Sequence, residues 1–231
     1  MILEDITRPV GSSLNDPNHV RWRVAELADY VDQAQAQIVL MVPDANSVTA
    51  AFSLAEGTRQ VIPNDGFQLL RVIRNLGPDG DQPGRPILPT IRSALDAETP
   101  DWHSRFGFEV QHFVYDPGAD KRAFYVFPAT EGKIEIVYSK EPAKLQRQGT
   151  GNSAHVDTSQ PLELAGRYMN PIIDWVLYRC WQKDAEYAGA QGRAEGHERA
   201  FYQQLGIKYQ ATEATEPTRR VRGPEAQRTV Q

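Results

Sequence analysis

The residues of this chain that could perform acid–base or metal chemistry lie closest together around position 103. His103 follows Asp101 and Trp102, and His112 comes nine residues later. Imidazole and carboxylate groups carry protons and bind metals at neutral pH, so His103 and Asp101 could serve a hydrolase. Their spacing matches neither HExxH nor another paired-histidine motif, and nearness in sequence does not supply the convergent geometry of a site. We therefore expect no catalytic role here, and the hydrolase is the weaker alternative.

Two further segments match chemical motifs only in part. Gly149-Thr150-Gly151 resembles the start of a dinucleotide loop, but no strand precedes it closely and no helix opens on it. Asp79 and Asp81 lie in a Gly/Pro-rich loop and are too few carboxylates for a calcium site. The sequence contains no G-x-S-x-G motif. It thus predicts neither a cofactor nor a metal ion, and it predicts a protein that is not an enzyme.

Arginines near the C-terminus are the basis of an alternative function. Arg219, Arg220, Arg222 and Arg228 could contact phosphate groups, as in a nucleic-acid-binding protein. Residues 209–231 also contain three glutamates, so four Arg minus three Glu leave a net charge of only +1. The whole chain has a net charge of -5, which does not favour broad binding to phosphate backbones.

The composition is that of a protein with one or two domains. The chain has 231 residues, 40% of them hydrophobic, and no apolar run long enough to span a bilayer. Residues 1–16 include Glu4, Asp5 and Asp16 and lack the apolar core of a signal peptide, so we expect synthesis in a cytoplasm. The single cysteine, Cys180, excludes an internal disulfide and is expected in the core.

The period of the apolar residues predicts a helix, then strands, then helices. Asp16-Pro17 is a helix-start signal, and an apolar stripe follows it as far as Pro43, formed by Val20, Val24, Leu27, Val31, Ala34 and Ile38. From residue 48 the period changes to two. The predicted strands are 48–54, 58–63, 67–76, 109–115, 122–127 and 134–138, with a loop at 77–86, a short helix at 90–98 and a hairpin turn at 116–121.

Two more helices are predicted near the C-terminus. The first carries Met169, Ile172, Ile173, Val176 and Cys180 on one face and is kinked or restarted at Pro171. The second spans 184–205, ends at Gly206, and carries Tyr187, Ala190, Ala194, His197, Phe201 and Leu205. Gly189, Gly192 and Gly196 share a helix face, which would permit close approach by another helix, either within the same bundle or from the next subunit.

The last stretch, residues 209–231, has no pattern that could fold alone. Pro217 and Pro224 block helix and central strand, and little apolar surface is available to offset the ordering entropy. This segment is either ordered by a partner or an ordinary frayed terminus.

Together these elements predict an α+β fold. A small helical bundle forms from both chain ends, a mainly antiparallel β domain is inserted in its sequence, and an extended C-terminal tail follows. The predicted divisions are an N-terminal arm at 1–17, the bundle at 18–43 and 160–207, the β domain at 44–145, a linker at 146–159 and the tail at 208–231.

Several runs of residues resemble a known family. Arg21-Trp22, Glu26-Leu27-Ala28-Asp29-Tyr30, Gln37-Ile38-Val39 and Pro43-Asp44-Ala45-Asn46 are similar to the opening of head-to-tail adaptor proteins of short-tailed bacteriophages, of the tail tubular or gatekeeper kind. Three later runs are similar to the closing helices of these adaptor proteins: Asp174-Trp175-Val176-Leu177-Tyr178-Arg179, Lys183-Asp184-Ala185-Glu186-Tyr187 and 201–206. Asn75-Leu76-Gly77 and Phe124-Tyr125-Val126-Phe127-Pro128 fit the strand section, so the resemblance covers most of 19–207.

The resemblance implies a structural protein of the virion neck, assembled in the host cytoplasm. Such proteins form a ring of twelve copies under the portal protein ring, receive the tail nozzle protein on their other face, and let DNA pass through their channel without sequence-specific binding. Their helical part typically lies against the portal and their β part faces the tail. No membrane contact is implied.

Two sets of residues follow as site hypotheses. The C-terminal extension would embrace the portal through Tyr209, Arg219, Arg220, Arg222 and Arg228. The loops at 77–86 and 116–121 would project to one end of the β domain and contact the tail partner through Asp79, Asp81, Arg85, Asp116, Asp120 and Lys121.

Overall fold

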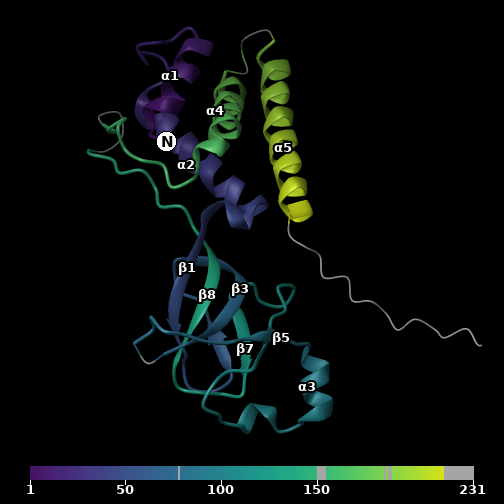
Figure 1. The fold of residues 1–231 in the computed structure, drawn as a ribbon. Helices are drawn as coiled ribbons and strands as arrows, with labels where there is room; N and C mark the ends of the chain where they lie inside the picture. The colour runs from purple at the N-terminus through teal and green to yellow at the C-terminus, as the bar shows by residue number, and fades with distance from the viewer. Residues whose placement is uncertain (78, 150–154, 185, 187–188, 216–231) are drawn as a thin grey trace, which may run out of the picture.

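The chain folds into a helical part and a β part at opposite ends of the molecule (Figure 1). The computed structural model describes residues 1–215 apart from 78, 150–154, 185 and 187–188, and for 207–215 it describes the backbone only. The helices are α1 (Glu4–Ser13), α2 (Val24–Met41), α3 (Arg92–Glu98), α4 (Met169–Lys183) and α5 (Ala190–Thr215), with short 3-10 turns such as η1 (Pro43–Asn46). The strands are β1 (Ser47–Ser53), β2 (Arg59–Val61), β3 (Gly66–Leu76), β4 (Pro83–Pro86), β5 (Leu88–Pro89), β6 (His112–Val114), β7 (Ala123–Phe127) and β8 (Lys133–Lys140).

The predicted α+β fold is confirmed, because helices from both chain ends enclose one core. Leu27, Val31 and Ile38 of α2 are fully buried against Val176 and Cys180 of α4. Residues spaced three and four apart lie on one face of a helix, which is why the sequence predicted this buried face. None of the buried residues that the structure describes is charged, so hydrophobic burial holds this part together.

The N-terminus is not the arm that the sequence suggested. Residues 4–13 form α1, and Leu3, Ile6 and Val10 are fully buried in the helical core. Leu3 N–H donates to the Gln160 carbonyl at 3.0 Å, which ties the chain start to the segment before α4. The apolar residues Leu3, Ile6 and Val10 have helical spacing, but Pro9 lies inside this segment and argues against a helix, since proline is disfavoured in a helix interior.

The predicted start of the second helix is also wrong. α2 begins at Val24, and Val20 is 81% exposed rather than on the buried face. The Asp16 carboxylate instead accepts the backbone N–H groups of Val20, Arg21 and Trp22 at 2.8–2.9 Å. The helix-start signal therefore orders the turn between α1 and α2.

The C-terminal helix is shifted and longer than predicted. It begins at Ala190 rather than at Asp184, and it continues to Thr215 rather than ending at Gly206. Gly189 precedes it with a φ of 90° and so lies outside the helix face on which it was placed. Tyr187 lies outside the described residues. Residues 209–215, expected in an extended tail, are helical.

The β part has the predicted strands and two short ones that were missed, β4 and β5. The strand order is β1-β8-β3-β4 in one sheet and β2-β7-β6-β5 in the other, and all pairs are antiparallel except β5 with β6. The predicted hairpin appears as β6 and β7, and the predicted short helix as α3. The loop expected at 77–86 ends in β4, which pairs with β3. A second core lies between the sheets, formed by residues such as Ile134, Ile136 and Phe124.

The chain passes between the helical part and the β part twice, from η1 into β1 and again after β8. Asn46, at the end of η1, donates from Nδ2 to the Lys140 carbonyl and to Glu163 Oε2, both at 3.0 Å. The described residues of the expected linker, 146–159, lie against the helices: Arg147 Nη2 bonds Asp29 at 2.6 Å and Asp32 at 2.7 Å. Hydrogen bonds therefore hold both connecting segments, the one before β1 and the one after β8, at the junction.

Candidate interaction surfaces

The loops predicted to bind a tail partner do not lie together. Leu69 N–H, near the start of β3, donates to the Lys121 carbonyl at 3.0 Å. Leu76, at the end of β3, pairs with Lys133, whose Nζ donates to the Asp79 carbonyl at 3.2 Å. The two loops thus adjoin opposite ends of β3, and the expectation that they project to one end is wrong.

Only one of these loops faces away from the helices. Gly66, which opens β3, pairs with Lys140, where the chain returns to the helical part, so residues 116–121 lie on the helical side. Asp116 Oδ1 accepts the Gly118 N–H at 3.0 Å, and Asp120 pairs with Arg59 at 3.3 Å. Asp79, Asp81 and Arg85 belong to the far end, because Asp79 bonds Lys133 and β4 pairs with the last residues of β3.

The far end also carries two exposed aromatic side chains that the sequence interpretation missed. Phe106 is 71% exposed and Phe108 is fully exposed. The backbone between them is held in place, since Gly107 N–H donates to the Ala129 carbonyl at 2.9 Å and Ala129 N–H donates to the Arg105 carbonyl at 3.0 Å. A Cβ on Gly107 would lie 2.5 Å from Pro128, so only glycine fits. Exposed aromatic residues on a fixed backbone are typical of protein-binding sites.

These phenylalanines lie at the end opposite the helices. Ala129, which forms a bridge with Phe106, belongs to the turn that leads into Lys133, the first residue of β8. The other end of β8, Lys140, adjoins the helical part. Figure 1 shows α3 and the neighbouring chain at this far end.

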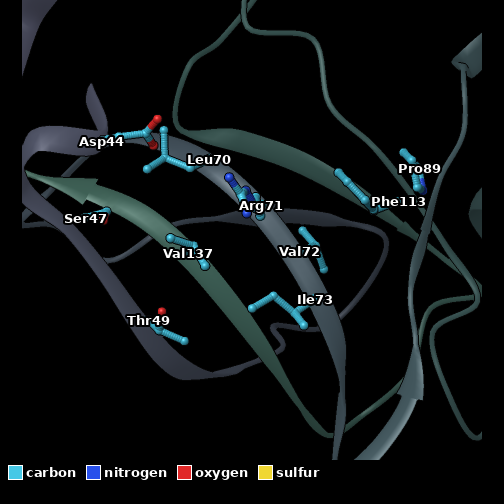
Figure 2. A pocket seen from close by; sticks show the side chains of 10 residues that line it. All are labelled: Asp44, Ser47, Thr49, Leu70, Arg71, Val72, Ile73, Pro89, Phe113 and Val137. Atoms are coloured by element: carbon cyan, nitrogen blue, oxygen red, sulfur yellow. The ribbon is translucent and has the colours of Figure 1, made fainter. Parts of the chain in front are cut away.

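A hollow of about 800 Å³ lies on the β1-β8-β3 sheet (Figure 2). Thr49 of β1 and Val137 of β8 are cross-strand partners along it, Ile73 of β3 lines it further along, and Pro89 and Phe113 of the second sheet border it. Its lining is mostly apolar and holds no imidazole or thiol; Asp44 and Arg71 are its charged residues. It lacks the convergent polar groups of a catalytic pocket.

His103 and Asp101, which were considered for acid–base chemistry, have separate partners, and the buried Nδ1 of His112 has no hydrogen-bond partner among the described residues. His103 Nδ1 lies 2.8 Å from Thr58 Oγ1, and its ring stacks on Trp102. The Asp101 carboxylate binds Arg105 Nε at 3.0–3.1 Å, and this hydrogen bond holds the pKa of Asp101 below its usual value. The structure therefore does not pair His103 with Asp101, as a hydrolase would need.

The glycine face of α5 is open. No described atom lies within 4 Å of the position that a Cβ on Gly192 or Gly196 would take. The helix packs on α4 through a different face, where Phe201 and Leu205 are buried and His197 Nδ1 lies 2.9 Å from Asp174 Oδ1. Among the described residues, no other helix of the bundle contacts Gly192 or Gly196, so the prediction of a contact within the bundle is wrong for these two glycines. Approach by a helix of the next subunit remains the open alternative.

The residues proposed to bind the portal cannot be placed individually. Tyr209 lies on the helical backbone of α5, and Arg219, Arg220, Arg222 and Arg228 lie outside the described residues. Across the part of the chain that the structure describes, no cluster of three or more His, Cys, Asp or Glu side chains could hold a metal ion. Nor does any described helix combine the length and apolar content needed to cross a bilayer.

The helical part and the β part thus each have a hydrophobic core of their own. Comparison with protein families matches residues 1–224 to the family described as SU10 adaptor protein, and the chain belongs to this family. Membership supports the structural role of a bacteriophage head-to-tail adaptor, located at the neck of the virion. A search of curated proteins found no match.

Proposed function

We propose that this chain forms a ring that joins the portal to the tail nozzle and lines the DNA channel. The observation that carries the proposal is the family membership, together with two separately cored parts at opposite ends of one chain. A ring of identical subunits needs a heterologous interface, in which two different surfaces of each copy meet. The open glycine face of α5 is a candidate for one of those surfaces.

The helical part is proposed to face the portal and the β part to face the tail. α5 itself runs from the outer end of the helical part toward the β part, so its C-terminal end lies on the side of the junction (Figure 1). The portal contact is proposed to use Arg219, Arg220 and Arg222, which could meet acidic groups of the portal. The proposed orientation places Phe106, Phe108 and the loop at 77–86 on the tail side. The loop at 116–121 then does not take part in tail binding, contrary to the original hypothesis.

Truncation after Thr215 tests the portal contact. The full chain, mixed with purified portal rings, should form a closed ring visible as class averages in electron micrographs. Removing 216–231 should leave the fold intact and weaken attachment to the portal. Replacing Arg219, Arg220 and Arg222 by alanine should reproduce much of this loss, more strongly at low salt, because ion pairs are less screened there.

A control separates charge from folding. Arg8 to alanine removes an exposed cation from the helical part and should leave attachment unchanged. If the truncated chain assembles on portals with unchanged affinity, the C-terminal segment is only a frayed end. If binding to DNA with a steep salt dependence appears instead, the nucleic-acid alternative replaces this proposal.

A further inference from the structure

The two sheets of the β part form one continuous series of strands. β4 pairs with β3, Ile87 N–H donates to the Ile73 carbonyl at 3.1 Å, and β5 then pairs with β6. Residues 83–89 thus carry the series from one sheet to the other, in the order β1-β8-β3-β4/β5-β6-β7-β2. The two ends of this series are β1 and β2, which are not paired with each other.

The backbone of β1 has hydrogen-bonding groups left over. Leu54 N–H, which directly follows β1, donates to the Gly132 carbonyl on the β8 side. Because bonding alternates along an antiparallel strand, Val48, Ala50 and Phe52 also bond β8. Ser47, Thr49, Ala51 and Ser53 must then direct their N–H and C=O groups outward. No described residue hydrogen-bonds these outward groups.

Among the four edge strands, β1 is the one whose own residues do least to block pairing with another strand, although the loop after β3 approaches the side chain of Ala51 at Gly80. β4 and β5 contain prolines, and β2 has only three residues, the first of them Arg59. β1 has seven residues, Ser47–Ser53, with neither a proline nor a charge. Exposed edges of this kind are normally blocked in natural proteins because they pair readily with another strand.

The core is also incompletely covered beside β1. Ile134 and Ile136 of β8 are fully buried, whereas their cross-strand partners Phe52 and Ala50 are only half-buried. An added strand would complete the backbone ladder and cover these side chains with its own alternate residues.

We propose that the β1 edge binds, by strand addition, an extended segment of a different virion protein that is uncharged and apolar at alternate positions. This inference rests on the proposed function for the presence of such a partner. The half-buried face of β1, formed by Val48, Ala50 and Phe52, favours uncharged apolar residues on the added strand, since neither these residues nor their partners on β8 could pair with a buried charge. The chain's own residues 216–231 fit poorly, because Arg219, Arg220 and Arg222 would place arginine on both faces of the added strand.

Proline substitution tests the backbone contact. Ala51→Pro removes one outward N–H without removing a bond to β8, and proline is tolerated on edge strands. Its matched control, Ala51→Ser, keeps the N–H. Attachment to the partner-bearing particle should weaken about tenfold in the proline variant, as expected for one hydrogen bond left unmade, and stay unchanged in the serine variant. Equal loss in both variants, or in neither, would overturn the proposal.

A cross-link identifies the occupant without relying on a proline. A photoreactive benzophenone amino acid at position 49, introduced in infected cells, should link this chain to a segment of a different virion protein with apolar residues at alternate positions. Cross-links only to other copies of this chain, or none although the chain is present in particles, would overturn the inference and leave the adaptor role standing. If the chain is absent from particles, the proposed function fails first, and the inference with it.

Discussion

At the scale of single residues, one buried amide links β3 to β4 and to the segment that precedes β6. Asn75 of β3 is only 5% exposed; its Nδ2 donates to the carbonyls of Arg85 and Val110, and its Oδ1 accepts the Val110 N–H at 2.9 Å. It therefore satisfies backbone groups of two neighbouring segments at once. Removing it would leave those groups buried without partners.

Asn75→Ala should destabilise the chain by about 1–3 kcal/mol, the typical cost of unsatisfied buried polar groups. Urea unfolding followed by fluorescence measures this loss. Asn64→Ala changes an exposed asparagine of the same part and should cost little. Equal stability of the two variants would show that the Asn75 bonds contribute no more than surface contacts.

Asp16 should make the stability of the turn between α1 and α2 depend on pH. The Trp22 N–H lowers the pKa of Asp16 below 3.8, opposed by burial and assisted by Val20 and Arg21 N–H groups. Because the folded pKa is the lower one, the carboxylate stabilises the fold fully above 3.8 and loses its effect as the pH falls through the folded pKa.

The melting temperature of Asp16→Asn should therefore lie below that of the wild type near neutral pH. The difference should persist down to pH 3.8 and close below it. Asp44→Asn, which alters an exposed carboxylate elsewhere, should show no such difference. A gap that widens in acid would contradict this account of Asp16.

At the scale of elements, α1 is part of the helical core. Ile6 is fully buried, so Ile6→Ala should lower the free energy of unfolding by about 2–5 kcal/mol through lost burial and a residual cavity. The matched control is Val20→Ala, because Val20 is highly exposed. Chemical denaturation of both variants measures the difference. A loss of about 0.5 kcal/mol or less for Ile6→Ala would instead fit a loosely attached arm.

At the scale of the whole molecule, the exposed aromatic pair should serve assembly rather than folding. Replacing Phe106 and Phe108 by serine should leave the melting temperature unchanged, because both side chains are exposed. The same change should weaken attachment of the next tail protein to neck-bearing particles by about tenfold or more, as for central contacts of an interface. Val20→Ser removes an exposed apolar side chain at the other end and is the control. Unchanged tail attachment would exclude this end as the tail-binding surface.

The sequence by itself determined those helices and strands in which the spacing of apolar residues shows which face is buried. The stripe of α2, the alternation in β1 and β8, and the β6–β7 hairpin were all predicted, because each depends on which face of a local segment is apolar. The boundaries at Val24, Ala190 and Thr215 were not, since packing and turn contacts override local signals at helix ends.

Only the tertiary structure decided which surfaces remain for partners. That Gly192 has an open face, that 77–86 and 116–121 lie at opposite ends of β3, and that β1 ends the strand series are all consequences of contacts between residues far apart in the chain. Phe106 and Phe108 look like core residues in a sequence, and their exposure follows only from the bonds that hold Gly107 against Ala129. A local pattern records that a side chain is apolar; long-range packing determines whether anything covers it.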